Sequence, residues 1–473
     1  MDDITSLSAT TLSRAIHSRH VSCRAVMEAY LARIEALNPK VNAIVSLRDT
    51  APLLSEADAA DRALSAGQTR GWLHGIPFAV KDLSEAKGLR CTYGSRSYRD
   101  YVPDFDDIHV ERIRAAGAIV IGKTNAPEMG LGSHTYNGVF GATRNPYDLG
   151  RSAGGSSGGA GAALATRMVA VADGSDMMGS LRNPAAFNNV VGFRPSFGRV
   201  PSLGSELYLG QHAVNGPMGR CVADVAALLS IQAGYDARDP LSLPDEALRL
   251  EARKDWSGVR IGWLGDYGGH LPFEPGVLEL CRDAMTVFSS LGASVSDVTA
   301  RFEMERLWWG WRTYRHFLVA GGQAADYTDG DKRAEMKPEM IWEIENGRAL
   351  SAADVLAASA IRSDWYRHVL ELFETNDFLV LPAAQVFPFD VDLDWPKEIA
   401  GRSMDTYHRW MEVVIGPTMA GLPVAAMPAG FGTAGLPAGI QIIGRPRADM
   451  AVLQLAAAYE ARTDWLQRMP AVA

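Results

Sequence analysis

Hydrophobic positions in the first half of the chain alternate between helical and extended spacing. Apolar residues at 26, 30, 34 and 37 follow helical spacing and predict a helix over 23–37. Ser22 is the expected cap at its start, and Asn38-Pro39 is its expected end. Further helices are expected over 51–65, 108–116, 158–166 and 222–232, and short apolar strands over 75–82, 118–122 and 168–172. Such alternation is typical of an α/β sheet.

A second run of elements begins after a shift in composition over 236–248. The pattern predicts a strand over 259–264, a helix over 275–291 and a strand over 294–298. Glycine-rich segments over 130–156 and 174–180 predict loops instead. All but one of the 11 tryptophans lie after residue 250, so bulky aromatics gather in the second half, either to frame a pocket or to fill the core.

Composition excludes several classes of function. The 473 residues carry a formal net charge of −9, which suits neither a nucleic-acid coat nor a protein of anionic membranes. No apolar run has membrane-spanning length, and the polar N-terminus lacks the apolar core of a secretory signal. The 4 cysteines are far apart and form no CxxC pair, which argues against a zinc site or a disulfide framework. We therefore expect a cytoplasmic protein with no metal, nucleic-acid or membrane partner.

One segment matches a nucleotide-binding pattern. Gly117-Ala-Ile-Val-Ile-Gly122-Lys123-Thr124 satisfies the expression of the phosphate-binding P-loop. A phosphate cradle needs a flexible loop between its glycines, whereas the residues here are a β-branched apolar run. We interpret the segment as a strand of the sheet.

Another segment matches a hydrolase pattern. Gly154-Gly155-Ser156-Ser157-Gly158 satisfies G-x-S-x-G, the nucleophile elbow of α/β-hydrolases. That elbow follows directly on an apolar strand, and the residues over 145–153 show no strand pattern. A helix after it is expected, so an elbow serine at 156 stays open as the alternative chemistry.

Lys81, Ser156 and Ser180 form a third candidate group. Lys81 follows an apolar strand, and the Gly-Gly-Ser-Ser-Gly-Gly run around Ser156 leads into an apolar helix, so it is not a linker. A serine hydroxyl becomes nucleophilic when a base takes its proton, and a lysine is such a base when burial lowers its pKa. A glycine-bearing turn before Ser180 can present backbone amides to an oxyanion. Acyl transfer would join these three residues.

These residues belong to a longer set of motifs. The chain resembles the amidase signature family, whose members hydrolyse amides with a Ser–cis-Ser–Lys triad. The resemblance spans nearly the whole chain, in matching order and spacing. Its motifs are Gly75-Ile-Pro-Phe-Ala-Val-Lys81-Asp82, Gly122-Lys-Thr-Asn125, Gly154-Gly-Ser-Ser-Gly-Gly159, Gly174-Ser-Asp176, Gly179-Ser-Leu-Arg182-Asn-Pro184, Ala420-Gly-Leu-Pro423 and Gly439-Ile-Gln-Ile-Ile-Gly-Arg-Pro446.

The resemblance implies a role for each matching residue. Lys81 would be the base, Ser156 would carry the cis peptide bond and relay protons, and Ser180 would be the nucleophile. The amides of Met177, Met178, Gly179 and Ser180 would form the oxyanion hole. Ser157 and Ser175 would support the triad by hydrogen bonding, and Asp176 and Arg182 would form an ion pair that braces the loop. No cofactor is implied.

Two features bear on the substrate. Family members usually carry glycine where this chain has Met178, and glycine has a freedom in φ that methionine lacks, so the loop geometry and the substrate size are in question. Trp308, Trp309 and Trp311 lie in a region that often shapes the substrate pocket of the family. Their other interpretation is helix core or a dimer interface. His134 and His212 lie near the glycine-rich loops, and we expect them to be structural.

The resemblance also implies the fold and the reaction. We expect one large α/β domain over 1–473, with a mixed central sheet flanked by helices on both faces, a signature core over 65–235 and a variable region over 236–400. The expected reaction is hydrolysis of a small, apolar or aromatic amide, anilide or carbamate through an acyl-enzyme on Ser180. The alternative is a glutamine amidotransferase subunit that supplies ammonia in a tRNA-dependent complex. The sequence leaves monomer and homodimer open.

Overall fold

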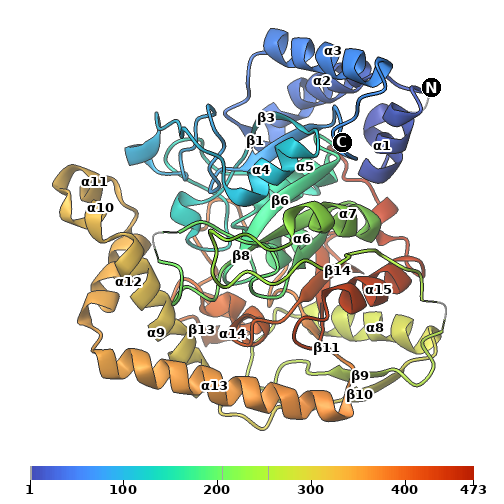
Figure 1. The fold of residues 1–473 in the computed structure, drawn as a ribbon. Coiled ribbons are helices and arrows are strands. Elements are labelled where there is room, and N and C mark those ends of the chain that lie inside the picture. The colour runs from blue at the N-terminus through green and yellow to red at the C-terminus, as the bar shows by residue number, and fades with distance from the viewer. Residues whose placement is uncertain (1–2, 205, 254, 473) are drawn as a thin grey trace.

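A mixed sheet of eight strands runs through the centre of the molecule (Figure 1). The computed structural model describes residues 3–204, 206–253 and 255–472. Within them the strand order of this sheet is β10-β9-β11-β15-β14-β7-β8-β6. The pairs β10–β9 and β9–β11 are parallel, and the other neighbours are antiparallel. The expected mixed α/β sheet is therefore confirmed.

A smaller sheet of order β1-β3-β2 continues this surface. Its strand β2 lies beside β6, and the Lys81 amide at the end of β2 donates to Asp173 Oδ1 on β6 at 3.0 Å. The strands are β1 Ile44–Val45, β2 Pro77–Lys81, β3 Ile119–Thr124, β4 Arg144–Asn145, β5 Asp148–Ser152, β6 Val171–Asp176, β7 Val191–Arg194, β8 Val214–Gly219, β9 Arg260–Trp263, β10 Ser294–Asp297, β11 Phe378–Pro382, β12 Glu398–Ile399, β13 Arg402–Ser403, β14 Val424–Phe431 and β15 Pro437–Ile443.

Helices cover both faces of the large sheet because its strands are apolar on both sides. On β11, Phe378 and Val380 pack in one cluster with α7, α8 and α15, while Leu379 and Leu381 pack in another with α9 and α13. The helices are α1 Ala9–His17, α2 Cys23–Val41, α3 Thr50–Ser65, α4 Ile108–Ala115, α5 Gly158–Ala165, α6 Arg182–Phe187, α7 Val222–Gln232, α8 Val277–Ser290, α9 Met304–Gly322, α10 Ala324–Thr328, α11 Gly330–Glu335, α12 Pro338–Ala349, α13 Ala352–Thr375, α14 Ile415–Met419 and α15 Asp449–Glu460.

Some predicted boundaries are wrong for local reasons. Helix α2 begins after Ser22, whose Oγ accepts from the Ala25 amide at 3.0 Å, but it runs through Pro39 to Val41. Proline there removes one N–H donor near the helix end, and the helix stops at Asn42, whose φ of 55° is left-handed.

The glycine-rich segments also hold more strand than predicted. β6 spans Val171–Asp176, not 168–172, because Gly174 and Ser175 pair with β8. The segment over 130–156 contains the β4–β5 hairpin, so the residues before Ser156 do include a strand, β5. β5 is half-exposed and lies outside the large sheet, unlike the strand of a nucleophile elbow. Gly122, Lys123 and Thr124 lie in buried β3, as the strand interpretation predicts.

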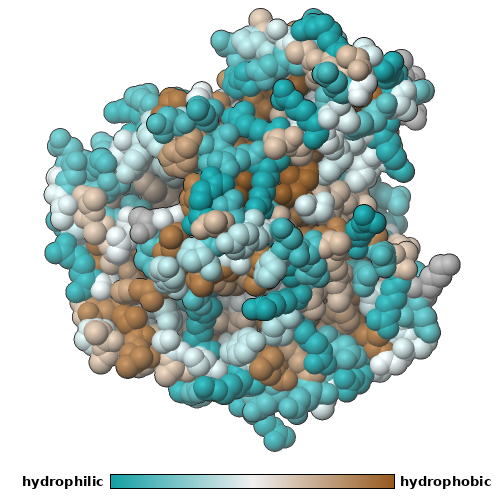
Figure 2. All heavy atoms as spheres, viewed as in Figure 1, coloured by the Kyte–Doolittle hydropathy of each residue, from teal (hydrophilic) through white to brown (hydrophobic). Residues whose placement is uncertain are grey.

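The outer face in Figure 2 is mostly hydrophilic, with apolar residues gathered near α9 and α12. Among the residues that the structure describes, no helix is long and apolar enough to cross a bilayer. All four cysteines carry free thiols.

Candidate active site

The Lys81 side chain ends among three serine hydroxyls. Lys81 is the last residue of β2, and its Nζ lies 2.8 Å from Ser156 Oγ, 2.8 Å from Ser157 Oγ and 3.0 Å from Ser175 Oγ. The three serines come from two segments that are distant in sequence from β2 and meet at the end of β6. The structure thus brings together four of the predicted site residues.

Burial dominates the electrostatics of this lysine. Lys81 is fully buried, and loss of solvent lowers its pKa from the ordinary 10.5 to about 7, although the charges of Asp173 and Asp176 act to raise it. Its nearest partners are neutral hydroxyls. A hydroxyl stabilises the charged ammonium form of lysine less than a carboxylate would. The amine is therefore available in its neutral form near pH 7.

The segment before the helix α5 is held in an unusual backbone conformation. The peptide bond between Gly155 and Ser156 is cis. The Gly155 carbonyl accepts from Ser133 Oγ at 2.5 Å, and Thr135 Oγ1 accepts from the Gly158 amide at 3.1 Å. These bonds anchor the backbone on both sides of Ser156, so its hydroxyl is fixed toward Lys81.

Ser180 lies beside the serine pair, in the loop between β6 and α6. Its carbonyl accepts from the Ser157 amide at 3.2 Å, which ties the two segments together. Ser180 is 8% exposed, whereas Ser157 and Lys81 are fully buried. Among the described residues, no hydrogen bond joins the hydroxyls of Ser156 and Ser180. In unliganded enzymes such catalytic bonds are often long and shorten when substrate binds.

The backbone of the loop over 177–180 leaves several amides free. Gly179 has a φ of 79°, and it alone of these four residues has a positive φ. Methionine at 178 is therefore compatible with the loop. The Gly179 amide donates to Asp176 Oδ1 at 3.0 Å, so it is already used. The amides of Met177, Met178 and Ser180 have no acceptor among the described residues.

A buried ion cluster braces this loop. Asp176 accepts from Arg182 Nε at 3.0 Å and Nη2 at 2.8 Å, and from Arg194 Nη1 at 3.2 Å. Burial acts to raise the pKa of Asp176, but the two guanidinium groups hold it well below its usual range. Arg182 also donates to Thr418 Oγ1 at 2.7 Å, which ties the loop to α14. The expected Asp176–Arg182 pair is present, and Arg194 joins it.

Sequence analysis missed a second buried cluster near Met177. Arg315 on α9 donates from Nε to Glu343 Oε1 at 2.9 Å and from Nη2 to the Tyr407 hydroxyl at 3.1 Å. Its Nη1 donates to Met177 Sδ at 2.8 Å. His316 Nδ1 lies 2.5 Å from Glu343 Oε2. No sequence motif marks this cluster.

The tryptophans of α9 lie mainly in the core. Trp308 and Trp311 are 2% and 1% exposed and stack with a centroid distance of 5.3 Å, and Trp309 is half-buried. Trp308 and Trp311 share an apolar cluster with Met178. The two tryptophans therefore pack against the loop over 177–180 through Met178.

The two histidines near the loops are also buried. His134 Nδ1 lies 2.7 Å from Ser152 Oγ and its Nε2 lies 3.0 Å from the Val391 carbonyl oxygen, and burial lowers its pKa to about 4. His212 packs its ring 4.8 Å from that of Tyr314. In the described part of the chain, no group of three or more His, Cys, Asp or Glu residues is arranged to hold a metal ion.

A buried amine beside serine hydroxyls can activate a nucleophile, and free loop amides can stabilise an oxyanion, which are the two requirements of acyl transfer. The Amidase family model matches residues 25–453, and the chain belongs to the amidase signature family of amide-hydrolysing enzymes. It is 36% identical to an acylamidase of Rhodococcus erythropolis, over 98% of this chain and 97% of that one.

Two further comparisons agree with this assignment. The chain is 33% identical to a glutamyl-tRNA(Gln) amidotransferase subunit from Ralstonia nicotianae, over 99% and 100% of the two chains. The crystal structure of a bacterial aryl acylamidase of the same family superposes with a TM-score of 0.91 at 30% identity, over 98% of this chain and 97% of that one.

Proposed function

We propose that this protein is an acylamidase that hydrolyses small apolar or aromatic amides through an acyl-enzyme on Ser180. The observation that carries the proposal is the fully buried Lys81 amine, 2.8 Å from Ser156 Oγ, in a loop system that also holds Ser180. The names of the Rhodococcus acylamidase and the aryl acylamidase support amides and anilides as the substrate class.

The proposed reaction moves one proton along a short relay. Ser180 Oγ attacks the amide carbonyl carbon, its proton passes to Ser156 Oγ, and the Ser156 proton passes to neutral Lys81 Nζ. The tetrahedral intermediate then expels the amine nitrogen, which takes the proton back through Ser156. Water repeats the same cycle on the acyl-enzyme and releases the carboxylic acid.

The oxyanion needs donors that are free before the substrate arrives. The amides of Met177, Met178 and Ser180 fit this need, while the Gly179 amide holds Asp176 and so fixes the loop. Met178 is the member of the apolar cluster with Trp308 and Trp311 that lies on this loop, and it offers an apolar contact for the acyl or amine group of the substrate. Ser157 and Ser175 hold the Lys81 amine in place.

The test is covalent labelling with a fluorophosphonate probe, with the adduct located by mass spectrometry. We expect one adduct on Ser180, about 10²-fold slower or more in Lys81→Met and Ser156→Ala, and unchanged in Ser230→Ala, a variant of an exposed serine on α7. An adduct on Ser156 would favour the nucleophile elbow, and absence of any adduct would contradict the proposal.

A second candidate function is a glutamine amidotransferase subunit, which the similarity to the Ralstonia protein supports. Turnover of 4-nitroacetanilide and of glutamine by the isolated chain separates the two functions. An acylamidase hydrolyses the anilide without a partner. Release of ammonia from glutamine only in the presence of a second protein chain would favour the amidotransferase.

A further inference from the structure

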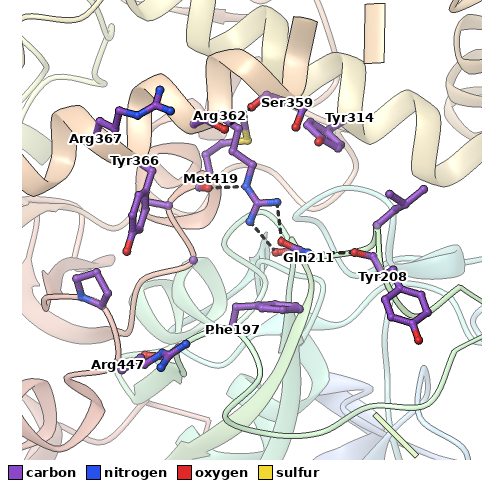
Figure 3. Close-up of a pocket in the computed structure, with 16 residues that line it drawn as sticks. Phe197, Tyr208, Gln211, Tyr314, Ser359, Arg362, Tyr366, Arg367, Met419 and Arg447 are labelled. Carbon is purple, nitrogen blue, oxygen red and sulfur yellow. Dashed lines mark hydrogen bonds between the residues drawn. The ribbon is translucent and has the colours of Figure 1, made fainter. Parts of the chain in front are cut away.

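A cavity of about 640 Å³ lies between α13, the residues at 196–197 and 208–211, and the turns that follow α14 and β15 (Figure 3). Its volume is in the range of sites that enclose small organic ligands. Lys81, Ser156 and Ser180 are not among the described residues that line it. The cavity is therefore separate from the candidate active site.

Arg362 stands at the centre of this cavity without an acidic partner. Its Nε donates to the Met419 carbonyl at 2.9 Å, and Nη1 and Nη2 donate to Gln211 Oε1 and the Gln211 carbonyl, both at 3.3 Å (Figure 3). These acceptors are neutral, and within the described residues Arg362 forms no ion pair. A guanidinium has five N–H donors, so two remain unused here.

The surroundings of Arg362 combine a second cation with aromatic rings. Arg447 lines the cavity below it, is exposed and has no ion pair among the described residues. Phe197 and Tyr366 add apolar surface between the two arginines. Arg367 also borders the cavity, but its Nη1 binds Asp364 at 3.0 Å and Figure 3 shows it pointing away.

One acidic residue, Glu206, is close in sequence to the lining residues Tyr208 and Leu209, but its carboxylate already has hydrogen-bond partners. Glu206 accepts from the amides of Tyr208, Leu209 and Gly210 at 2.7 to 2.9 Å, so its carboxylate serves its own turn. The cavity thus keeps an excess of positive charge beside aromatic surface.

We propose that this cavity binds a small aromatic carboxylate. Arg362 and Arg447 hold the two carboxylate oxygens, and the ring packs on Phe197 and Tyr366. A planar guanidinium with two unused N–H groups can donate both of them to the oxygens of a carboxylate. The aromatic walls favour an organic acid over an inorganic ion.

The experiment is calorimetric titration of the Ser180→Ala protein with benzoate, in parallel with benzyl alcohol and inorganic phosphate. Since this variant lacks the proposed nucleophile, the result does not depend on the proposed function. We expect saturable binding of benzoate and none of the neutral alcohol. Arg362→Gln and Arg447→Gln, each added to this variant, weaken binding about tenfold or more, the size of one charge-assisted hydrogen bond.

Arg367→Gln, in the same background, is the matched control, because it removes the same charge from the rim and leaves binding within about twofold. If Arg362→Gln lowers the melting temperature, Arg447→Gln still tests the site, because Arg447 is exposed. Four results would overturn the proposal: no benzoate binding up to about 10 mM, phosphate binding as tight as benzoate, no effect of Arg447→Gln, or an equal loss in Arg367→Gln.

Discussion

Lys81 and Arg315 are two buried basic side chains that approach the candidate active site from different regions of the molecule. Lys81 comes from β2 in the first half of the chain and ends among serine hydroxyls. Arg315 comes from α9 in the second half and ends against the Glu343 carboxylate. Their burial is similar, and their partners differ.

This difference in partners determines whether each side chain is charged near pH 7. Burial lowers the pKa of Lys81 to about 7, since the nearby charges only partly offset the loss of solvent. Burial acts in the same direction on Arg315, but Tyr407 and Glu343 raise its pKa above the usual range. Burial with neutral partners yields an amine that can exchange protons, whereas burial against a carboxylate yields a permanent charge that holds structure.

Replacing Lys81 tests the first half of this contrast and has the largest expected effect. We expect Lys81→Met to lower kcat/KM for an anilide about 10³-fold or more, because a general base is lost while the buried volume is kept. Steady-state kinetics and circular dichroism check this. A variant that keeps more than about a tenth of the activity would exclude Lys81 as the base.

The same variant has a predicted effect on stability. With a pKa near 7 in the folded chain and 10.5 when unfolded, the unfolded state binds an extra proton between these pH values. Wild-type stability therefore rises with pH across this window, by as much as about 5 kcal/mol, and Lys81→Met loses that rise. Denaturant unfolding at pH 7 and pH 9 measures it, and equal slopes in both proteins would contradict the lowered pKa.

Removing the partner of Arg315 tests the second half. We expect Glu343→Gln to lower the free energy of unfolding by about 3–5 kcal/mol, because a buried guanidinium loses its carboxylate. Glu345→Gln on the exposed side of α12 is the matched control, with an expected change below about 1 kcal/mol. A similar loss of unfolding free energy in both variants would show that the buried Arg315–Glu343 pair contributes no more to stability than an exposed glutamate does.

The pH dependence of that pair has the same sign as that of Lys81 but lies at lower pH, because both pKa values are lower in the folded chain than in the unfolded one. Burial acts to raise the pKa of Glu343. The pKa nevertheless lies well below the usual 4.5, because the carboxylate interacts with Arg315, His316 and His408. Its stabilisation is therefore present above pH 4.5 and is lost only as the pH falls through the lower folded pKa. The difference in stability between wild type and Glu343→Gln stays constant from pH 7 to about pH 5.

Activity also depends on the charge of Lys81, over a lower range of pH than stability does. If neutral Lys81 is the base, kcat/KM rises about tenfold per pH unit below pH 7 and levels off above it. An anilide assay from pH 5 to pH 9 in constant ionic strength measures this profile. A flat profile between pH 5 and pH 7 would contradict a base with a pKa near 7.

The contrast also explains what sequence analysis predicted and what it missed. Lys81, Ser156 and Ser180 stand in motifs whose order and spacing resemble those of the amidase signature family, so the resemblance predicts one shared site for them. Glu343 and Arg315 lie on helices where a buried charge has no distinctive sequence pattern, and their pairing depends on how α9 packs on α12. Sequence analysis did not predict the extension of β6 to Asp176, because glycine and serine are typical of turns. Here they lie in a strand that pairs with β8.

The smallest expected effect concerns the contact that links the two regions, between Arg315 Nη1 and Met177 Sδ at 2.8 Å. Met177→Leu keeps the volume and the backbone amide that we assign to the oxyanion, and removes only a weak acceptor. We expect kcat to change less than about threefold and the stability by less than about 1.5 kcal/mol. Kinetics on an anilide and thermal unfolding check both values. A tenfold or larger loss of kcat would mean that Arg315 positions the oxyanion loop through this sulfur, so that the permanent charge takes part in catalysis as well as in structure.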